Sequence, residues 1–212
     1  MFENRKSRID QAGSEGIIGG QTIQGGFVQV KGISMASTRE FVKSKYGPDD
    51  FKKWLESLSP ESRDIFEKPV LASEWYPPKQ AIVEPTDAVC RMFYKGDIRG
   101  AWDLGRYSAE YSLKGIYKIF LRITTPEYLM ERATKVFTSY YNPSNMIVAS
   151  AEPGKAVLRI TQFEGITDSI EHRMAGWLER AVELCGKKSS KVTIQKSMAK
   201  TKGPAEFLVE WN

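Results

Sequence analysis

The spacing of hydrophobic residues changes once, near residue 141, and this change restricts the fold more than any other feature of the chain. Before it, most apolar residues recur every three or four positions, as on the buried face of a helix. After it, apolar and polar residues alternate in short runs, which is typical of strands. The clearest helical run covers residues 98–122 and predicts one helix of about six turns. Its buried face consists of Ile98, Trp102, Gly105, Ala109, Leu113, Ile116 and Phe120.

Capping residues and prolines mark where helices begin and end in the first 140 residues. Ser37 and Glu40 have the spacing of a capping box, which predicts a helix that ends before Gly47. Thr125 precedes Pro126, whose fixed backbone angle suits the first position of a helix. Further helices are predicted over 49–58, 61–67, 79–95 and 126–140, and a strand over 27–33.

The last 70 residues predict two β-hairpins on either side of a helix. The first hairpin covers 146–160, the helix runs from Asp168 to Cys185, and the second hairpin covers 192–211. Because an isolated hairpin is only marginally stable in water, the two hairpins are expected to pair. The sequence therefore predicts an α+β fold, in which a helical layer packs on an antiparallel sheet and the chain ends as hairpin, helix, hairpin.

The first 26 residues differ in composition from the rest of the chain. They hold six glycines among mostly polar residues, which predicts a flexible leader before a single domain over 27–212. No apolar run approaches the roughly 18 residues that a membrane span needs. The chain has only two cysteines, which do not form a spaced disulfide framework, and no secretory signal. Both features indicate a reducing compartment, so a cytoplasmic protein is expected.

Residues that carry catalysis or bind metals are scarce. His172 is the only histidine, and the sequence around it does not resemble a catalytic triad. Cys90 and Cys185 are too few to form a structural zinc site, and each borders an apolar helical face. Glu179 and Glu183 share a helix surface with arginines, as expected for a solvated face. The sequence predicts no enzyme, no metal and no cofactor.

Aromatic residues on the helical faces give the main indication of a ligand. Gly105 supports it, because a glycine inside a helix costs about 1 kcal/mol relative to alanine, which suggests close approach of another helix or of a bound molecule. An apolar cavity between helices is a common place for a small ligand. The alternative is that these aromatic residues only fill the core. The candidate ligand-binding residues are Trp102, Gly105, Phe120, Phe137, Tyr141 and Trp177.

Two further segments are candidate interaction surfaces. Trp75 and Tyr76 precede two prolines and so belong to an extended or turned segment. Six lysines and no acidic residue lie between Glu183 and Glu206, so this stretch has a charge of +6. Because the net charge of the whole chain is +5, the other residues together sum to −1. Its candidate contact residues are Lys187, Lys188 and Lys191. No aromatic residue alternates with the lysines, so neither nucleic acid nor an anionic membrane is the expected partner.

Several segments resemble a conserved family of unassigned function that is abundant in myxobacteria and their relatives. Its first signature resembles residues 105–121, which begin GRYSAE and end GIYKIFL, and its second resembles GWLERAVELCG at 176–186. SEWYP at 73–77 and YYN at 140–142 also fit, so the likeness covers 27–212. That family is distantly similar to the 4-vinyl-reductase-like domains, which are small-molecule sensors and share a fold with the TRAPP transport-particle subunits.

This resemblance implies an α+β homodimer with an apolar pocket between helices. Many vinyl-reductase-like domains bind zinc through three cysteines, of which only the first has a counterpart here, Cys185. The other two positions fall near Ser197 and Ala205, which cannot replace thiolates, so the resemblance predicts no metal site.

The preferred hypothesis is a non-enzymatic regulatory or sensory module that binds a small apolar or aromatic ligand. One alternative is a scaffold that binds an unidentified protein through surfaces such as Trp75 and Tyr76. The other is a protein that binds anionic surfaces through its lysine-rich end.

Overall fold

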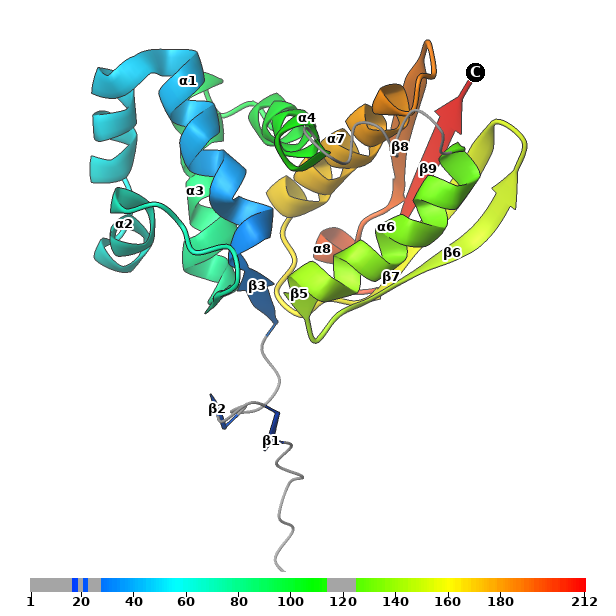
Figure 1. Cartoon of the computed structure of the whole chain (residues 1–212), viewed down its shortest axis with the longest axis horizontal. Helices are drawn as coiled ribbons and strands as arrows, with labels where there is room; N and C mark the ends of the chain where they lie inside the picture. The colour runs from blue at the N-terminus through cyan, green and yellow to red at the C-terminus, as the bar shows by residue number, and fades with distance from the viewer. Residues whose placement is uncertain (1–16, 19–20, 23–27, 114–124) are drawn as a thin grey trace, which may run out of the picture.

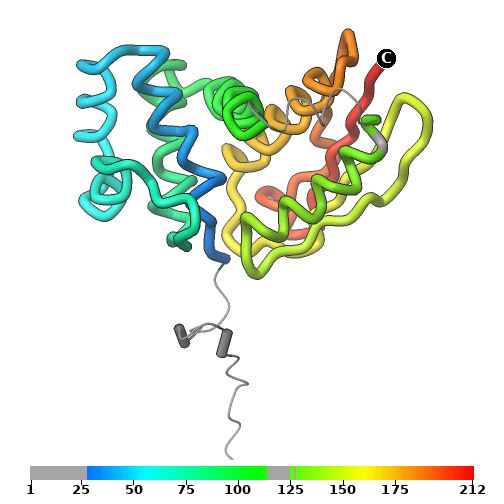
Figure 2. The backbone as a smooth tube through the Cα atoms, in the orientation of Figure 1, coloured from blue at the N-terminus to red at the C-terminus, as the bar shows by residue number. Residues whose placement is uncertain are grey.

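The computed structural model describes residues 17–18, 21–22, 28–113 and 125–212, in which two halves lie side by side (Figure 1). The first half is helical and extends from α1 to α3. The second half consists of α6, α7 and a four-stranded sheet, and α4 lies between the halves. The backbone trace in Figure 2 follows the chain from the helical half through α4 to the sheet, where it ends. This arrangement confirms the predicted α+β class.

The helical half begins with a long, broken helix. Helix α1 spans Gly32–Glu56 and is interrupted at Gly47, whose φ of 85° favours glycine. It is followed by α2 (Pro60–Glu67), a π-helical turn at Lys79–Val83, α3 (Glu84–Phe93) and α4 (Arg99–Leu113). The predicted break at Gly47 is confirmed, but the predicted start is wrong. Ser37 does not cap α1, because it is buried and its hydroxyl hydrogen-bonds to Ser108.

The second half follows the predicted hairpin, helix, hairpin order. It comprises α6 (Pro126–Tyr140), β6 (Asn145–Glu152), β7 (Lys155–Gln162), α7 (Asp168–Leu184), β8 (Ser190–Lys196), α8 (Met198–Thr201) and β9 (Ala205–Trp211). The strands are antiparallel in the order β6-β7-β9-β8, so the two hairpins pair through β7 and β9, as predicted. Thr125 caps α6 and Thr167 caps α7, each by accepting a hydrogen bond from a backbone N–H.

The sheet has one apolar and one polar face because its residues alternate. Leu158 of β7 is directly paired with Phe207 of β9, and both are fully buried on the face covered by helices. On the opposite face, Glu206 accepts from Arg159 at 2.8 Å and forms an ion pair with Lys196 at 3.0 Å. The core therefore lies between the sheet and α6 and α7.

A second, smaller sheet joins the two halves. Strand β3 (Gln29–Lys31) pairs with β4 (Trp75–Tyr76) on one side and with β5 (Tyr141–Asn142) on the other. Strand β5 directly follows α6, so the helical half is tied to the end of that helix. Of the predicted leader, the structure describes only the short pair β1 (Ile17–Ile18) and β2 (Gln21–Thr22).

Helices α4 and α7 pack very closely because each has a glycine at the crossing. A Cβ added at Gly105 would lie 1.9 Å from the carbonyl oxygen of Arg173, and one at Gly176 would lie 2.1 Å from that of Trp102. Of the two alternatives raised by Gly105, the structure thus shows a neighbouring helix. Helix α4 is described to Leu113, so the rest of the predicted 98–122 helix, with Phe120, lies outside the described residues. None of the helices in the described part is long and apolar enough to cross a membrane.

Candidate functional site: a two-faced cavity between the halves

A cavity of about 70 Å³ lies where the two halves meet. Its walls come from α1, α4, α6, α7 and the first residues of β5 and β6. Since a single water needs roughly 10–15 Å³ on this scale, the cavity has room for about five to seven waters or a ligand of similar size. The lining residues are Ile33, Ser34, Ser37, Gly105, Ser108, Ser112, Ala133, Val136, Phe137, Tyr140, Tyr141, Met146, Arg173, Met174, Trp177 and Leu178.

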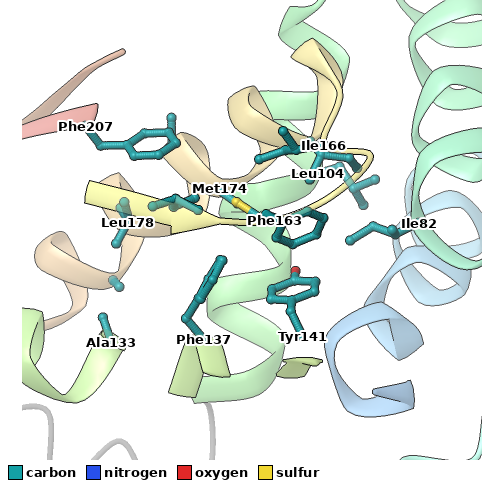
Figure 3. Close-up of a cluster of buried hydrophobic side chains, with 14 of the residues drawn as sticks. Ile82, Leu104, Ala133, Phe137, Tyr141, Phe163, Ile166, Met174, Leu178 and Phe207 are labelled. Carbon is teal, nitrogen blue, oxygen red and sulfur yellow. The ribbon is translucent and has the colours of Figure 1, made fainter. Parts of the chain in front are cut away.

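One wall of the cavity is apolar. It is built by α6, which contributes Phe137, and by α7, which contributes Met174 and Leu178; all three are buried. Figure 3 shows Phe137 and Tyr141 side by side, with Met174 and Leu178 across the cluster. The rings of Phe137 and Tyr141 lie 5.0 Å apart between centroids, and Phe163 packs against both. This wall suits the hydrocarbon part of a ligand.

The remaining lining is partly polar and contains a buried charge. Arg173 of α7 is only 4% exposed. Its Nη1 donates to Thr86 Oγ1 at 3.0 Å, and its Nη2 donates to Thr38 Oγ1 at 3.0 Å and to the Ser34 carbonyl at 3.2 Å. Serines from α1 and α4 complete the wall: Ser34, Ser37, Ser108 and Ser112.

The environment of Arg173 shifts the pKa of two groups. Burial lowers the pKa of Arg173 to about 10, so the guanidinium is still charged at neutral pH. Burial also raises the pKa of Tyr141, although the nearby charge of Arg173 acts in the opposite direction. The Tyr141 side chain is therefore a neutral phenol, which can donate a hydrogen bond.

The structure brings together four of the six residues proposed from sequence to bind a ligand. Gly105, Phe137, Tyr141 and Trp177 all line the cavity. Trp102 does not; its Nε1 instead donates to Glu179 Oε2 at 3.0 Å. Phe120 lies outside the described residues.

Sequence reasoning missed Arg173, which it placed on a solvated helix surface. The structure corrects this, because Arg173 faces inward. A signal was present: Arg173, Trp177 and Ala181 lie four residues apart and share one face of the predicted helix. A charged residue on a buried face needs an explanation, since burying a charge is costly.

Glu179 and Glu183 form an ion-pair network between α4 and α7. Arg106 of α4 lies 2.5 Å from Glu179 and 2.9 Å from Glu183, and Arg180 lies 2.5 Å from Glu183. Burial would raise the pKa of Glu183, but hydrogen bonds from Arg106 and Arg180 hold it below its ordinary value. The two carboxylates are half-buried and paired with arginines rather than with each other, so this network serves helix packing.

The candidate surface residues lie apart from the cavity. Trp75 is 38% exposed on β4, with the Lys31 ammonium 5.4 Å from its ring centre, while Tyr76 is half-buried against the core. Lys187 and Lys188 lie in the turn after α7, and Lys191 is exposed on β8, an edge strand of the sheet. Two other lysines of this stretch form ion pairs: Lys196 with Glu206 and Lys200 with Asp168. The basic stretch is therefore partly neutralised by acidic residues from elsewhere in the fold.

The histidine and both cysteines of the chain lie outside the cavity wall. His172 is half-buried, and its Nδ1 lies 2.8 Å from the carbonyl oxygen of Asp168. Burial raises the pKa of the Cys90 thiol and that of the Cys185 thiol, the latter to about 11. Among the residues that the structure describes, no group of three or more His, Cys, Asp or Glu side chains could hold a metal ion.

No family model matches the sequence, and no curated protein resembles it closely enough in sequence to count as a relative. Solved structures do resemble its fold. The H-NOX protein of S. oneidensis in the Fe(II)NO state has a TM-score of 0.66 and 12% identity, over 86% of this chain and 99% of that one. This chain adopts the H-NOX fold.

Two further H-NOX structures support this assignment. A point mutant of the Fe(II) unliganded H-NOX protein from K. algicida has a TM-score of 0.64 and 12% identity, over 86% of this chain and 96% of that one. A structure described as modulating haem redox potential through porphyrin distortion has a TM-score of 0.60 and 8% identity, over 85% of this chain and 99% of that one.

The expected resemblance to 4-vinyl-reductase-like domains and TRAPP subunits is therefore wrong, since the matching structures named above are H-NOX proteins. Short sequence signatures and the order of helices and hairpins do not fix how the elements pack. The predicted homodimer rested on that resemblance and stays untested.

One of these H-NOX structures is described by its haem, but the described cavity lining of this chain offers neither a histidine nor a cysteine to haem iron. Haem iron is held by His, Cys, Met or Tyr side chains. The single histidine and both cysteines of the chain lie outside the cavity lining, and burial keeps the Tyr141 phenol neutral. The lining does contain two thioethers, Met146 and Met174, and a second phenol, Tyr140. The described lining of this cavity thus lacks the imidazole and thiolate donors that commonly hold haem iron.

Proposed function

We propose that this chain is a non-enzymatic sensory module that binds a small, partly apolar molecule in the cavity between its halves. The observation that carries the proposal is the position of the cavity. Its walls come from α1 and α4 as well as from α6 and α7, so a ligand would contact both halves at once. Binding energy from both sides can shift their relative position, which is how a small ligand changes a protein's output.

The H-NOX fold supports this proposal by analogy. The H-NOX structures hold Fe(II), and one of them carries NO. The present chain would keep the fold and the ligand position between helices while taking a different, smaller ligand.

Native and denaturing mass spectra of the freshly purified full chain test the proposal. We expect extra mass in the native spectrum that is lost on denaturation, and no Soret absorption. A Soret band from stoichiometric haem would overturn our exclusion of porphyrin. The native spectrum also shows whether the chain is a dimer.

A pair of variants locates the ligand. Ala133→Leu adds bulk to a buried residue that lines the cavity, whereas Ala151→Leu adds the same atoms at an exposed position at the end of β6. We expect the retained mass to disappear in the first variant and to persist in the second. Equal retention by both folded variants would refute binding in this cavity.

A protein-binding scaffold is the second candidate, supported by one surface. Ile33, Leu71 and Trp75 are exposed by 40%, 62% and 38%. They lie close together, because the Ile33 amide donates to the Ala72 carbonyl and Lys31 is paired with Trp75. Trp75→Ala would then abolish a complex without unfolding the chain.

A further inference from the structure

The charge of Arg173 has no counterion within the described protein. All its hydrogen bonds given above go to hydroxyl or carbonyl oxygens, and none of the described carboxylates forms an ion pair with it. Residues 114–124, which the structure does not describe, contain no Asp or Glu; the acidic groups that it leaves undescribed are Glu3, Asp10, Glu15 and the Glu127 side chain. A buried cation that is compensated only by neutral dipoles is costly, and proteins normally pair such a charge.

Arg173 is also one of the residues that line the cavity, so an anion inside the cavity could reach it. Hydroxyl groups are close to the guanidinium: Ser108 Oγ lies 3.5 Å from Nη2, and Ser37 Oγ lies 2.6 Å from Ser108 Oγ. Hydroxyls rotate and can donate as well as accept, and the neutral Tyr141 phenol can donate too. This corner of the cavity therefore offers one positive charge and several donors.

We propose that the cavity recognises a small monocarboxylate, whose carboxylate binds at Arg173, Ser37 and Ser108 and whose short apolar body lies against Phe137, Met174 and Leu178. This inference rests on the proposed function and names the class of ligand. One guanidinium matches one negative charge, and a planar carboxylate fits the fork of an arginine. A phosphate dianion would leave a negative charge uncompensated in an apolar enclosure. The small cavity limits the body to a few carbon atoms or one ring that extends toward its opening.

Isothermal titration of the full chain with matched acids and amides tests this proposal. The probes are butyrate and benzoate against butyramide and benzamide, at constant ionic strength, with inorganic phosphate as a competitor. Each amide has nearly the shape of its acid but no charge. Hydrogen bonds to a charged group contribute about 1.5–3 kcal/mol, so we expect the acids to bind roughly ten- to a hundredfold more tightly. Phosphate should not compete.

Variants separate recognition from a structural role of Arg173, which also ties α7 to α1 and α3. In Arg173→Gln the preference should reverse, so that the amide binds at least as well as the acid. Loss of stability alone would not reverse a preference. If Arg173→Gln does not fold, Ser37→Ala with Ser108→Ala should weaken the acid several-fold more than the amide.

The outcomes distinguish the two proposals. Equal binding of acids and amides, blocked by Ala133→Leu, would overturn carboxylate recognition and leave a ligand-binding cavity. Binding of acids that survives Ala133→Leu, or that Arg173→Gln leaves unchanged, would place the carboxylate elsewhere and overturn the inference. Binding of neither class would overturn the carboxylate inference, while the native mass spectra decide the ligand-binding proposal separately.

Discussion

Replacing Gly105 with alanine probes how closely α4 and α7 approach. The new Cβ would stand 1.9 Å from the carbonyl oxygen of Arg173 and 2.8 Å from its carbonyl carbon. Cβ atoms essentially never approach another atom within 3.0 Å, so the helices would have to separate by about 1.1 Å, the difference between 3.0 and 1.9 Å. Since the opposing atoms belong to the backbone of α7, rotation of a side chain cannot relieve the contact.

The cost follows from two opposing terms. Overpacking of a well-packed interior typically costs about 1–3 kcal/mol, and a backbone clash belongs at the upper end or above. Alanine regains about 1 kcal/mol through its higher helix propensity. We expect Gly105→Ala to lower the free energy of unfolding by about 2–3 kcal/mol, which corresponds to a Tm lower by roughly 4–12 °C for a chain of this size.

Urea and thermal denaturation followed by circular dichroism measure this effect. Gly203→Ala is the matched control, because the nearest atom to its new Cβ would be Thr201 Oγ1 at 3.5 Å, an ordinary contact. Gly176→Ala should destabilise similarly, and the double variant should lose less than the sum, because both changes push the same helices apart. A Gly105→Ala protein as stable as the parent, or more stable, would show that helix propensity dominates and that the close packing is misjudged.

Three further predictions concern buried polar and titratable groups. Glu171 is fully buried and accepts from the first two amides of α8, so Glu171→Ala should cost about 2–3 kcal/mol in a urea titration, whereas a change below 0.5 kcal/mol would contradict this capping role. In Glu84 and Glu183, burial would raise the pKa, but hydrogen bonds from serines and arginines respectively lower it. The two ionised carboxylates therefore contribute to folding stability in full above the unfolded-state pKa of about 4.3, and this contribution is lost as the pH falls below it. Glu183→Gln should flatten the decline in the free energy of unfolding between about pH 5 and 3. The raised pKa of Cys90 and Cys185 predicts slow labelling by a thiol reagent at pH 7.5 and fast labelling in urea; fast stoichiometric labelling of the folded chain would contradict it.

Local patterns predicted most, but not all, of the described elements of this fold. Thr125 with Pro126 located the start of α6, and Gly47 located the break in α1, because caps and backbone angles depend on neighbours in sequence. The start of α1 failed for the opposite reason. Ser37 has the sequence context of a cap, but its hydroxyl hydrogen-bonds to Ser108, which is 71 residues away in sequence. Only the folded chain reveals such a partner.

The cavity was predicted in part. Its aromatic residues, such as Phe137 and Trp177, lie on buried helical faces that can be recognised from the spacing of apolar residues in the sequence. The polar wall was missed because Ser34, Ser37, Ser108 and Arg173 come from three separate helices and look unremarkable in each. The family resemblance misassigned the fold for a similar reason, since short signatures report local sequence rather than the packing of the two halves.

Tyr141 belongs both to the cavity wall and to the small sheet, where it pairs with Val30. A ligand that displaces the backbone of Tyr141, and not only its ring, therefore either breaks this short pairing or carries β3 along. In both cases the amide protection of β3 changes with occupancy of a cavity that β3 does not line. Hydrogen exchange at Val30 would thus report ligand binding without an added probe. It would also show that a change at the cavity is transmitted to the helical half through β3.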